Sequence, residues 1–119
     1  MNLKSLIGKL NETTRAALEA AAGLCLSRTH YDIEIEHYLL KLLDVPDGDL
    51  MGILKAFGIN KSKLAADLTH GLDKLKSGNA RTPAFSPSVV NMIREGWLIG
   101  SVDFEAAALG FQFNIIDSD

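Results

Sequence analysis

Two histidines and two glutamates lie in one short stretch of the chain, at His30, Glu34, Glu36 and His37. Imidazole and carboxylate groups are zinc ligands in many proteins, so this cluster is the first candidate for metal chemistry. Glu36 and His37 are adjacent, however, and neighbouring side chains on a helix diverge. Their spacing favours local roles, with Glu36 near a helix N-terminus and His37 packing or hydrogen-bonding nearby. We predict no metal site.

The other reactive groups do not form a catalytic constellation. Cys25 is the single cysteine and lies on an apolar helical stripe, which predicts a buried, inert thiol. His70 is expected on the surface. No nucleophile is paired with an identifiable base, and no Gly-x-x-x-x-Gly-Lys-Ser/Thr phosphate loop occurs in the sequence. We therefore predict no catalysis, no cofactor and no nucleotide binding by this chain.

The composition indicates one small helical domain. The chain has 119 residues, of which 47% are hydrophobic and only 7% aromatic, so we expect a core of Leu, Ala and Ile between helices. The net charge of −3 gives no general attraction to nucleic acid or to anionic membranes. No apolar run approaches the ~20 residues of a membrane span, and the N-terminus lacks the pattern of a signal peptide. A cytoplasmic location is expected.

Helices must position these side chains, and the first two lie before residue 28. One short helix, residues 3–10, carries an apolar face made of Leu3, Leu6, Ile7 and Leu10. Asn11 is placed to cap a second helix that ends at Ser27. Because the apolar stripe continues almost in register across Asn11, a single bent helix over residues 3–27 is an alternative.

The next predicted helix, residues 36–43, has leucines on most of its circumference. A helix that apolar must be covered by its neighbours. We therefore predict that Leu39, Leu42 and Leu43 are nearly inaccessible to solvent.

Three more helices follow. Asp49 is expected to cap residues 49–57, with Gly58 in the left-handed conformation that closes that helix. Asn60 caps residues 60–76, whose leucines recur at steps of four. A polar linker, residues 77–83, then leads to a helix over residues 87–99, with Ser86 as its cap and Pro87 in the first turn.

Part of the chain repeats. A shift of 75 positions superimposes an apolar residue, a small polar cap and an apolar helical stripe from each segment. It places Leu10, Asn11, Thr14, Ala17, Leu18, Ala21 and Leu24 on Phe85, Ser86, Val89, Met92, Ile93, Gly96 and Ile99. The correspondence stops after about Ser101. Residues 104–119 are too short for a second full repeat, and we expect their apolar side chains to cover the face that the missing helices would occupy.

This organisation resembles the substrate-receptor amino-terminal domain of the Clp family of ring-forming AAA+ unfoldases, which contains two tandem four-helix repeats. The resemblance covers residues 3–104. It rests on the extra helix before the first repeat, on the helix start Glu36-His37-Tyr38-Leu39, and on Pro83-Ala84-Phe85-Ser86-Pro87 followed by Trp97-Leu98. These details are most similar to the family members that recycle contracted sheaths of the bacterial type VI secretion system.

The resemblance implies a single all-α domain, a Clp N-domain-like helical bundle with one four-helix repeat plus a partial second repeat. Residues 1–10 would form the extra helix, 11–76 the first repeat, 77–84 the linker and 85–119 the partial second repeat with an atypical tail. Two features depart from the family pattern. The usual Arg-Ser-Gly loop and leucine-rich helix are absent after Phe104, and Ile35 occupies a helix-start position where many relatives have threonine.

The resemblance also implies a protein partner, namely a short helix near the N-terminus of the large sheath subunit, and an AAA+ ring in the full-length protein. The apolar face of the first helix is either core or one wall of a groove for that helix. In the second case Leu3, Leu6, Ile7 and Leu10 form one side of the groove, and Phe85 and Val89 contribute the other. A free-standing helical adaptor or regulator is the alternative function.

Overall fold

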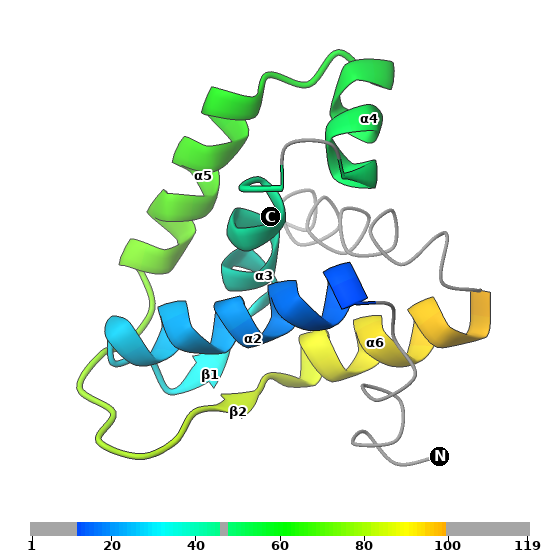
Figure 1. Ribbon diagram of the computed structural model, residues 1–119. Helices are drawn as coiled ribbons and strands as arrows, with labels where there is room; N and C mark the ends of the chain where they lie inside the picture. Colours follow the sequence, from blue (N-terminus) through cyan, green and yellow to red (C-terminus); the bar gives the residue numbers. More distant parts are fainter. Residues whose placement is uncertain (1–11, 46–47, 100–119) are drawn as a thin grey trace.

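The computed structural model describes residues 12–45 and 48–99 (Figure 1). In chain order the elements are α2 (Glu12–Ser27), β1 (Asp32–Ile33), α3 (Ile35–Leu42), α4 (Asp49–Ala56), α5 (Lys61–Asp73), β2 (Ala84–Phe85) and α6 (Pro87–Ile99). The predicted all-α class is confirmed. The predictions for residues 1–11, including the choice between two helices and one bent helix, and for the tail at 104–119 lie outside the described residues.

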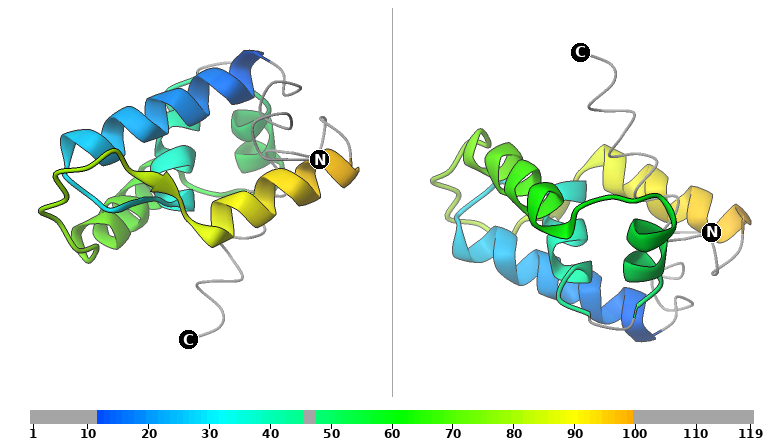
Figure 2. Two further views of the ribbon diagram at one scale, coloured as in Figure 1. Left: turned by 90° about the horizontal axis from the view of Figure 1, so that it is seen from below. Right: turned by 90° about the horizontal axis from the view of Figure 1, so that it is seen from above.

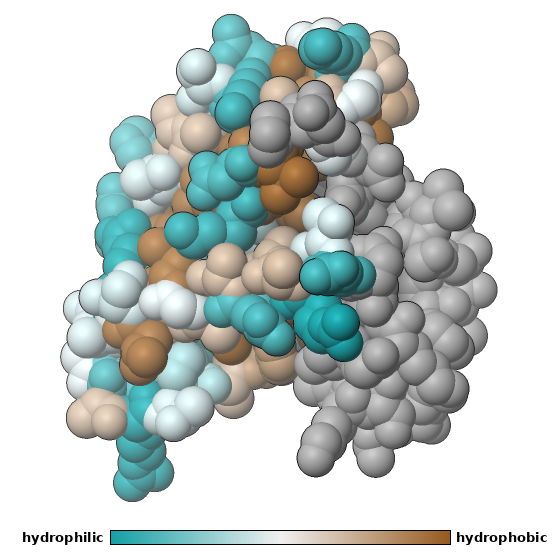
Figure 3. All heavy atoms as spheres, in the orientation of Figure 1, coloured by the Kyte–Doolittle hydropathy of each residue, from teal (hydrophilic) through white to brown (hydrophobic). Residues whose placement is uncertain are grey.

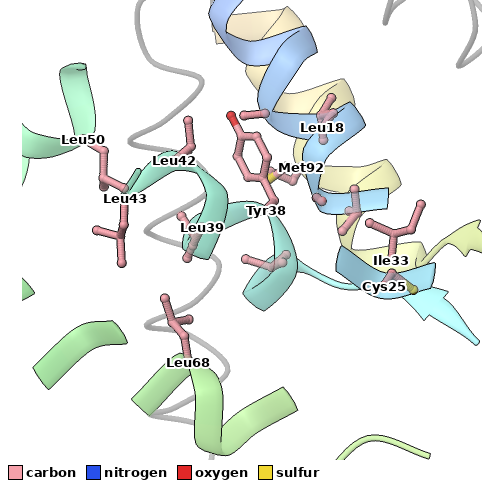
Figure 4. Close-up of a cluster of buried hydrophobic side chains, with 14 of the residues drawn as sticks. Leu18, Cys25, Ile33, Tyr38, Leu39, Leu42, Leu43, Leu50, Leu68 and Met92 are labelled. Carbon is pink, nitrogen blue, oxygen red and sulfur yellow. The ribbon is translucent and has the colours of Figure 1, made fainter. Parts of the chain in front are cut away.

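Helix α3 lies in the centre of the described structure, between α2 on one side and α5 on the other. Five of its eight residues are buried, with Tyr38 and Leu39 0% exposed and Leu42 1% exposed; Leu43, which follows the helix, is 3% exposed. Figure 4 shows these residues meeting Leu18 from α2, Leu68 from α5 and Met92 from α6. The predicted burial of the leucine-rich helix is confirmed, because α3 has apolar neighbours on nearly every side.

Helices α2 and α6 occupy related positions on two sides of α3 (Figure 2). Three residue pairs that the 75-position shift superimposes are buried in both helices. They are Thr14 with Val89, Ala17 with Met92, and Leu18 with Ile93. The periodicity shared by the two segments therefore corresponds to two equivalent buried helix faces.

Most of the predicted helix ends are where the local sequence places them. The side chain of Asn60 accepts a hydrogen bond from the Lys63 N–H at 3.0 Å, and Ser86 Oγ accepts one from the Val89 N–H at 3.2 Å. Gly58 has φ +65°, a left-handed conformation in which glycine meets no Cβ clash. Helix α6 has the predicted bounds.

Two predicted caps are wrong. Gly48, and not Asp49, is the N-cap of α4, so Asp49 is the first helical residue. Glu34 is the N-cap of α3, which makes Ile35 a helical residue whose side chain is 1% exposed. An apolar residue is therefore suited to position 35, since it enters the core and does not cap. Helix α5 also ends at Asp73, earlier than the predicted residue 76.

The pairing of β1 with β2 was not predicted. The two short strands are parallel, with Asp32 opposite Ala84 and Ile33 opposite Phe85, and the Ser86 N–H extends the ladder by donating to the Ile33 carbonyl at 3.0 Å. This ladder joins the loop after α2 to the start of α6. Within the described residues, every helix is too short or too polar to cross a bilayer.

The surface in the orientation of Figure 1 carries apolar residues in separate patches among polar ones (Figure 3). The large hydrophobic side chains with the highest exposure among the described residues are Leu26 at 57%, Tyr31 at 43% and Phe57 at 76%. They come from different elements, so each is a candidate control site for substitutions in the core or in a binding site.

Truncation of Leu42 to alanine should lower the free energy of unfolding by ~2–5 kcal/mol, because it leaves a cavity between closely packed helices. Chemical denaturation of purified protein measures this loss. Leu26→Ala makes the same chemical change at a side chain that is 57% exposed, and it should change stability by less than about 0.5 kcal/mol. Equal effects of the two substitutions would contradict the central position of α3.

Candidate functional site

Phe85 and Val89 are the two predicted site residues within the described part of the chain. Phe85 lies in β2, is partly buried and packs against the core, so part of its ring remains accessible. Val89 lies in the first turn of α6 and is 0% exposed. A ligand can touch Phe85 directly, whereas contact with Val89 requires the surrounding chain to move. Leu3, Leu6, Ile7 and Leu10 lie outside the described residues.

Several hydrogen bonds fix the backbone around Phe85. Its strand pairs with β1, and the next residue, Ser86, both donates its N–H to the Ile33 carbonyl and caps α6 through its hydroxyl. Ser86 is 2% exposed, so these hydrogen bonds are shielded from water. The position of Phe85 relative to α6 is therefore fixed by backbone pairing as well as by packing.

Directly beside this ladder the structure brings together His30 and His37. His30 Nδ1 lies 2.9 Å from His37 Nε2, and the ring centroids are 5.1 Å apart. The two side chains are 3% and 0% exposed. Both histidines are candidate ligands in the sequence, but their contact was not predicted. His37 is the third residue of α3 and Glu34 is its cap, and this pattern of a polar N3 residue after a capping residue is the signal that could have indicated it.

The hydrogen bonds of the pair determine where its protons lie. The Glu34 N–H donates to His37 Nδ1 at 2.9 Å, so this nitrogen must be unprotonated. The proton of neutral His37 is therefore on Nε2, which donates to His30 Nδ1. The proton of neutral His30 is then on its Nε2. A chain of donors thus runs from the backbone at the start of α3 through both rings.

Burial keeps both rings neutral near pH 7. Burial, the neighbouring His30 ring and the positive charge of Arg28 together lower the pKa of His37 from 6.5 to about 4. Burial and Arg28 also lower the pKa of His30, although Asp73 acts in the opposite direction. Arg28 itself pairs with Asp73 at 2.6 Å across the loop and the end of α5. A neutral imidazole pair can accept a proton, but the thiol nearest to it among the described residues, that of Cys25, donates to the backbone carbonyl of His30 at 3.6 Å and not to either ring, so this arrangement does not indicate catalysis.

Cys25 lies on α2 and is 0% exposed, as the sequence predicts. Its thiol donates to the Asp32 carbonyl at 3.3 Å. Burial raises the pKa of the thiol, and the carboxylates of Asp32 and Glu34 raise it further. Cys25 is therefore a structural thiol that supports β1.

The linker after α5 is tied to the loop after α2 through Thr29. This residue lies two positions after the end of α2 and has φ +56°, a conformation that is strained for a β-branched side chain. Its hydroxyl accepts from the Gly78 N–H and its carbonyl accepts from the Asn79 N–H, both at 2.9 Å. The Asn79 amide group also donates to the His30 carbonyl at 3.1 Å. These bonds fix the path by which the chain reaches β2.

A surface pocket of about 190 Å³ opens beside the histidine pair. Its lining is mixed, with polar, charged and aromatic groups: His30, Tyr31, Asp32, Glu34, Leu75 and Lys76. The Lys76 ammonium lies 5.4 Å from the centre of the Tyr31 ring, which closes one side of the pocket. Among the described residues, no group of three or more His, Cys, Asp or Glu side chains gathers closely enough to hold a metal ion.

Comparison with known proteins places this architecture among characterised domains. The sequence model of the Clp repeat (R) N-terminal domain family matches residues 9–97. The AAA+ ATPase ClpV1 of Pseudomonas aeruginosa is 37% identical over 100 residues, which are 84% of this chain and 11% of that protein. The chain therefore spans about a tenth of the length of this curated relative.

Solved structures give the same result. The N-domain of ClpV from Vibrio cholerae is 32% identical and superimposes with a TM-score of 0.82, over 98% of this chain and 74% of that one. A complex of a ClpV N-domain with a VipB peptide is also 32% identical, with a TM-score of 0.80 over 98% of this chain and 75% of that one.

The Cys25 thiol should react very slowly with a thiol reagent such as Ellman's reagent in the native protein, because it is buried and its raised pKa leaves little thiolate. Full reaction should follow only on addition of denaturant. Rapid stoichiometric labelling of the folded protein at pH 7 would contradict the structural role of this thiol.

Stability should fall as the pH falls from about 6.5 to about 4. The folded-state pKa of His37 lies below its unfolded value, so the unfolded chain binds the proton first and acid favours unfolding. Denaturation at a series of pH values measures the slope. His37→Gln should flatten it in this window, whereas His70→Gln, a matched change at an exposed histidine, should leave it unchanged.

Proposed function

Because the chain belongs to the family of Clp repeat N-terminal domains, we propose that it is the peptide-receptor domain of a ClpV-type AAA+ unfoldase. It binds a short amphipathic helix near the N-terminus of the large sheath subunit of a type VI secretion system. The bound segment is then passed to ATPase modules elsewhere in the full-length protein, which form the ring and supply the energy for sheath disassembly. This work takes place in the bacterial cytoplasm.

The observation that carries the proposal is the likeness to the complex of a ClpV N-domain with a VipB peptide. The likeness extends over 98% of this chain at 32% identity, so it includes the core, the helix order and the repeat junction. A domain that shares these features has the framework on which such a peptide is held in that structure. The absence of a phosphate loop from the sequence fits a receptor that depends on another module for ATP hydrolysis.

We place the peptide in a groove between residues 3–10 and the start of α6. Leu3, Leu6, Ile7 and Leu10 provide one apolar wall, and the accessible part of Phe85 provides the other. Val89 contributes from beneath, since it is buried in the core. The backbone pairing that holds Phe85 supports this role, because a contact residue on a rigid element loses little entropy on binding.

A single helix in a groove makes a small, mostly apolar contact. Affinity should therefore be in the micromolar range, with fast dissociation. Such kinetics suit a receptor that must release its cargo to the motor.

Substitution of Leu6 by aspartate should abolish binding of a peptide copied from the N-terminal helix of the sheath subunit. Phe85→Ala should weaken binding about tenfold, because it removes one aromatic contact of the kind that dominates small interfaces. Calorimetric titration of the purified domain measures both effects. Circular dichroism and the melting temperature should show that both variants remain folded, with a small loss of stability for Phe85→Ala.

Phe57→Ala is the matched control, because it removes the same ring from a site that is 76% exposed and distant in sequence from β2. It should bind the peptide as the unmodified chain does. If Leu6→Asp and Phe85→Ala fold and bind normally, the groove is elsewhere. If Leu6→Asp unfolds the domain, Leu6 belongs to the core and does not form a wall of the site.

A further inference from the structure

We propose that the His30–His37 hydrogen bond is a proton-sensitive clasp, which holds β1 against β2 at neutral pH and releases this ladder when the pair takes up a proton. The inference concerns the chain itself and does not depend on the identity of the peptide. Through the pairing of β1 with β2, the protonation of the histidines would nevertheless control the position of Phe85.

The position of the pair in the chain makes it a clasp. His30 lies in the loop three positions after the end of α2 at Ser27, His37 is in the first turn of α3, and β1 (Asp32–Ile33) lies between the two histidines. The 2.9 Å bond between the rings therefore closes the ends of the segment that carries β1. Because the strand has only two residues, its own ladder is too short to hold this segment without such support.

Neither ring of the neutral pair has a nitrogen that can take up a proton without the loss of a hydrogen bond. His37 Nδ1 accepts from the Glu34 N–H, and His30 Nδ1 accepts from His37 Nε2. A proton on the first nitrogen breaks the bond to the start of α3. A proton on the second places two N–H groups against each other. Either event opens the clasp or the helix start.

The charged groups around the histidine pair do little to stabilise a proton added to either ring. They come from the loop, from α5 and from the residues after it: Arg28, Asp32, Glu34, Asp73 and Lys76. Arg28 disfavours a second positive charge, and its own pairing with Asp73 limits the help that this carboxylate gives to His30. Since the rings are 3% and 0% exposed, water cannot solvate an added charge unless the segment moves.

The segment that would move is connected to the linker and to Phe85. The His30 carbonyl accepts from the Asn79 amide group, and Ile33 pairs with Phe85 and accepts from the Ser86 N–H. Release of β1 therefore loosens both attachments between the two repeats. Helices α3 and α5 keep their mutual packing, which involves neither strand.

Hydrogen exchange followed by NMR tests the clasp through single amides. Between pH 7 and pH 4 the protection factor of the Ser86 amide should fall about tenfold in the unmodified chain. The amide of Leu64, which donates to the Asn60 carbonyl in α5, should keep its protection. A parallel fall at both amides would mean global unfolding and would overturn the proposal, as would no change at Ser86 while the histidine rings titrate.

Three variants separate the histidines from the carboxylates that also titrate near pH 4. In the double variant His30→Gln/His37→Gln the side-chain amides can replace the hydrogen bonds of the rings but cannot take up a proton in this pH range, so Ser86 should be as well protected at pH 4 as at pH 7. His37→Ala, which lacks both bonds, should leave Ser86 poorly protected already at pH 7. His70→Gln should behave as the unmodified chain. An acid response of the double variant equal to that of the unmodified chain would assign the effect to carboxylates and refute the clasp.

Discussion

The structure depends on the burial of one short helix. Helix α3 carries apolar side chains on nearly its whole circumference, and Tyr38, Leu39 and Leu42 are almost inaccessible. Such a helix is stable only inside a shell of other helices. Helices α2 and α5 pack directly against α3, and the buried residues of α6 join the same hydrophobic core. Helices α2 and α6 resemble each other in the spacing of their buried residues, because each turns one apolar face to this core.

The proposed binding site lies where this shell is joined. Where β1 pairs with β2, a region called the junction below, apolar packing gives way to polar contacts. These contacts are the strand pairing, the helix caps and the His30–His37 bond. Buried polar groups of this kind add less net stability than apolar packing does, but they specify geometry. Phe85 stands at the border between the two regions, partly in the core and partly accessible. A ligand that contacts Phe85 can therefore affect the pairing of β1 with β2, and a change in that pairing can affect the binding of the ligand.

The sequence predicts the helices well because their signals are local. Apolar periodicity and the capping residues Asn60 and Ser86 lie within a few positions of the structure they determine. The strands β1 and β2 could not be predicted in this way. Strands of two residues show no alternation of apolar and polar side chains, and their pairing depends on the assembled fold. The contact of His30 with His37 was missed for the same reason. Phe85 lies just ahead of α6, where the sequence predicts it, whereas the complete burial of Val89 could be seen only once the helices were assembled.

The linker's attachment to the end of α2 also has a consequence for the order in which the chain folds. Thr29 and Gly78 are 49 positions apart, whereas the helices are built from neighbours in sequence. The entropy of closing a loop of that length must be met before its few hydrogen bonds form, so helices α2 to α5 should assemble first and the junction last. An interaction made late in folding mainly slows unfolding and has little influence on the folding rate. These late contacts would therefore set how long the folded domain keeps the loop after α2 joined to the linker that leads to β2 and α6.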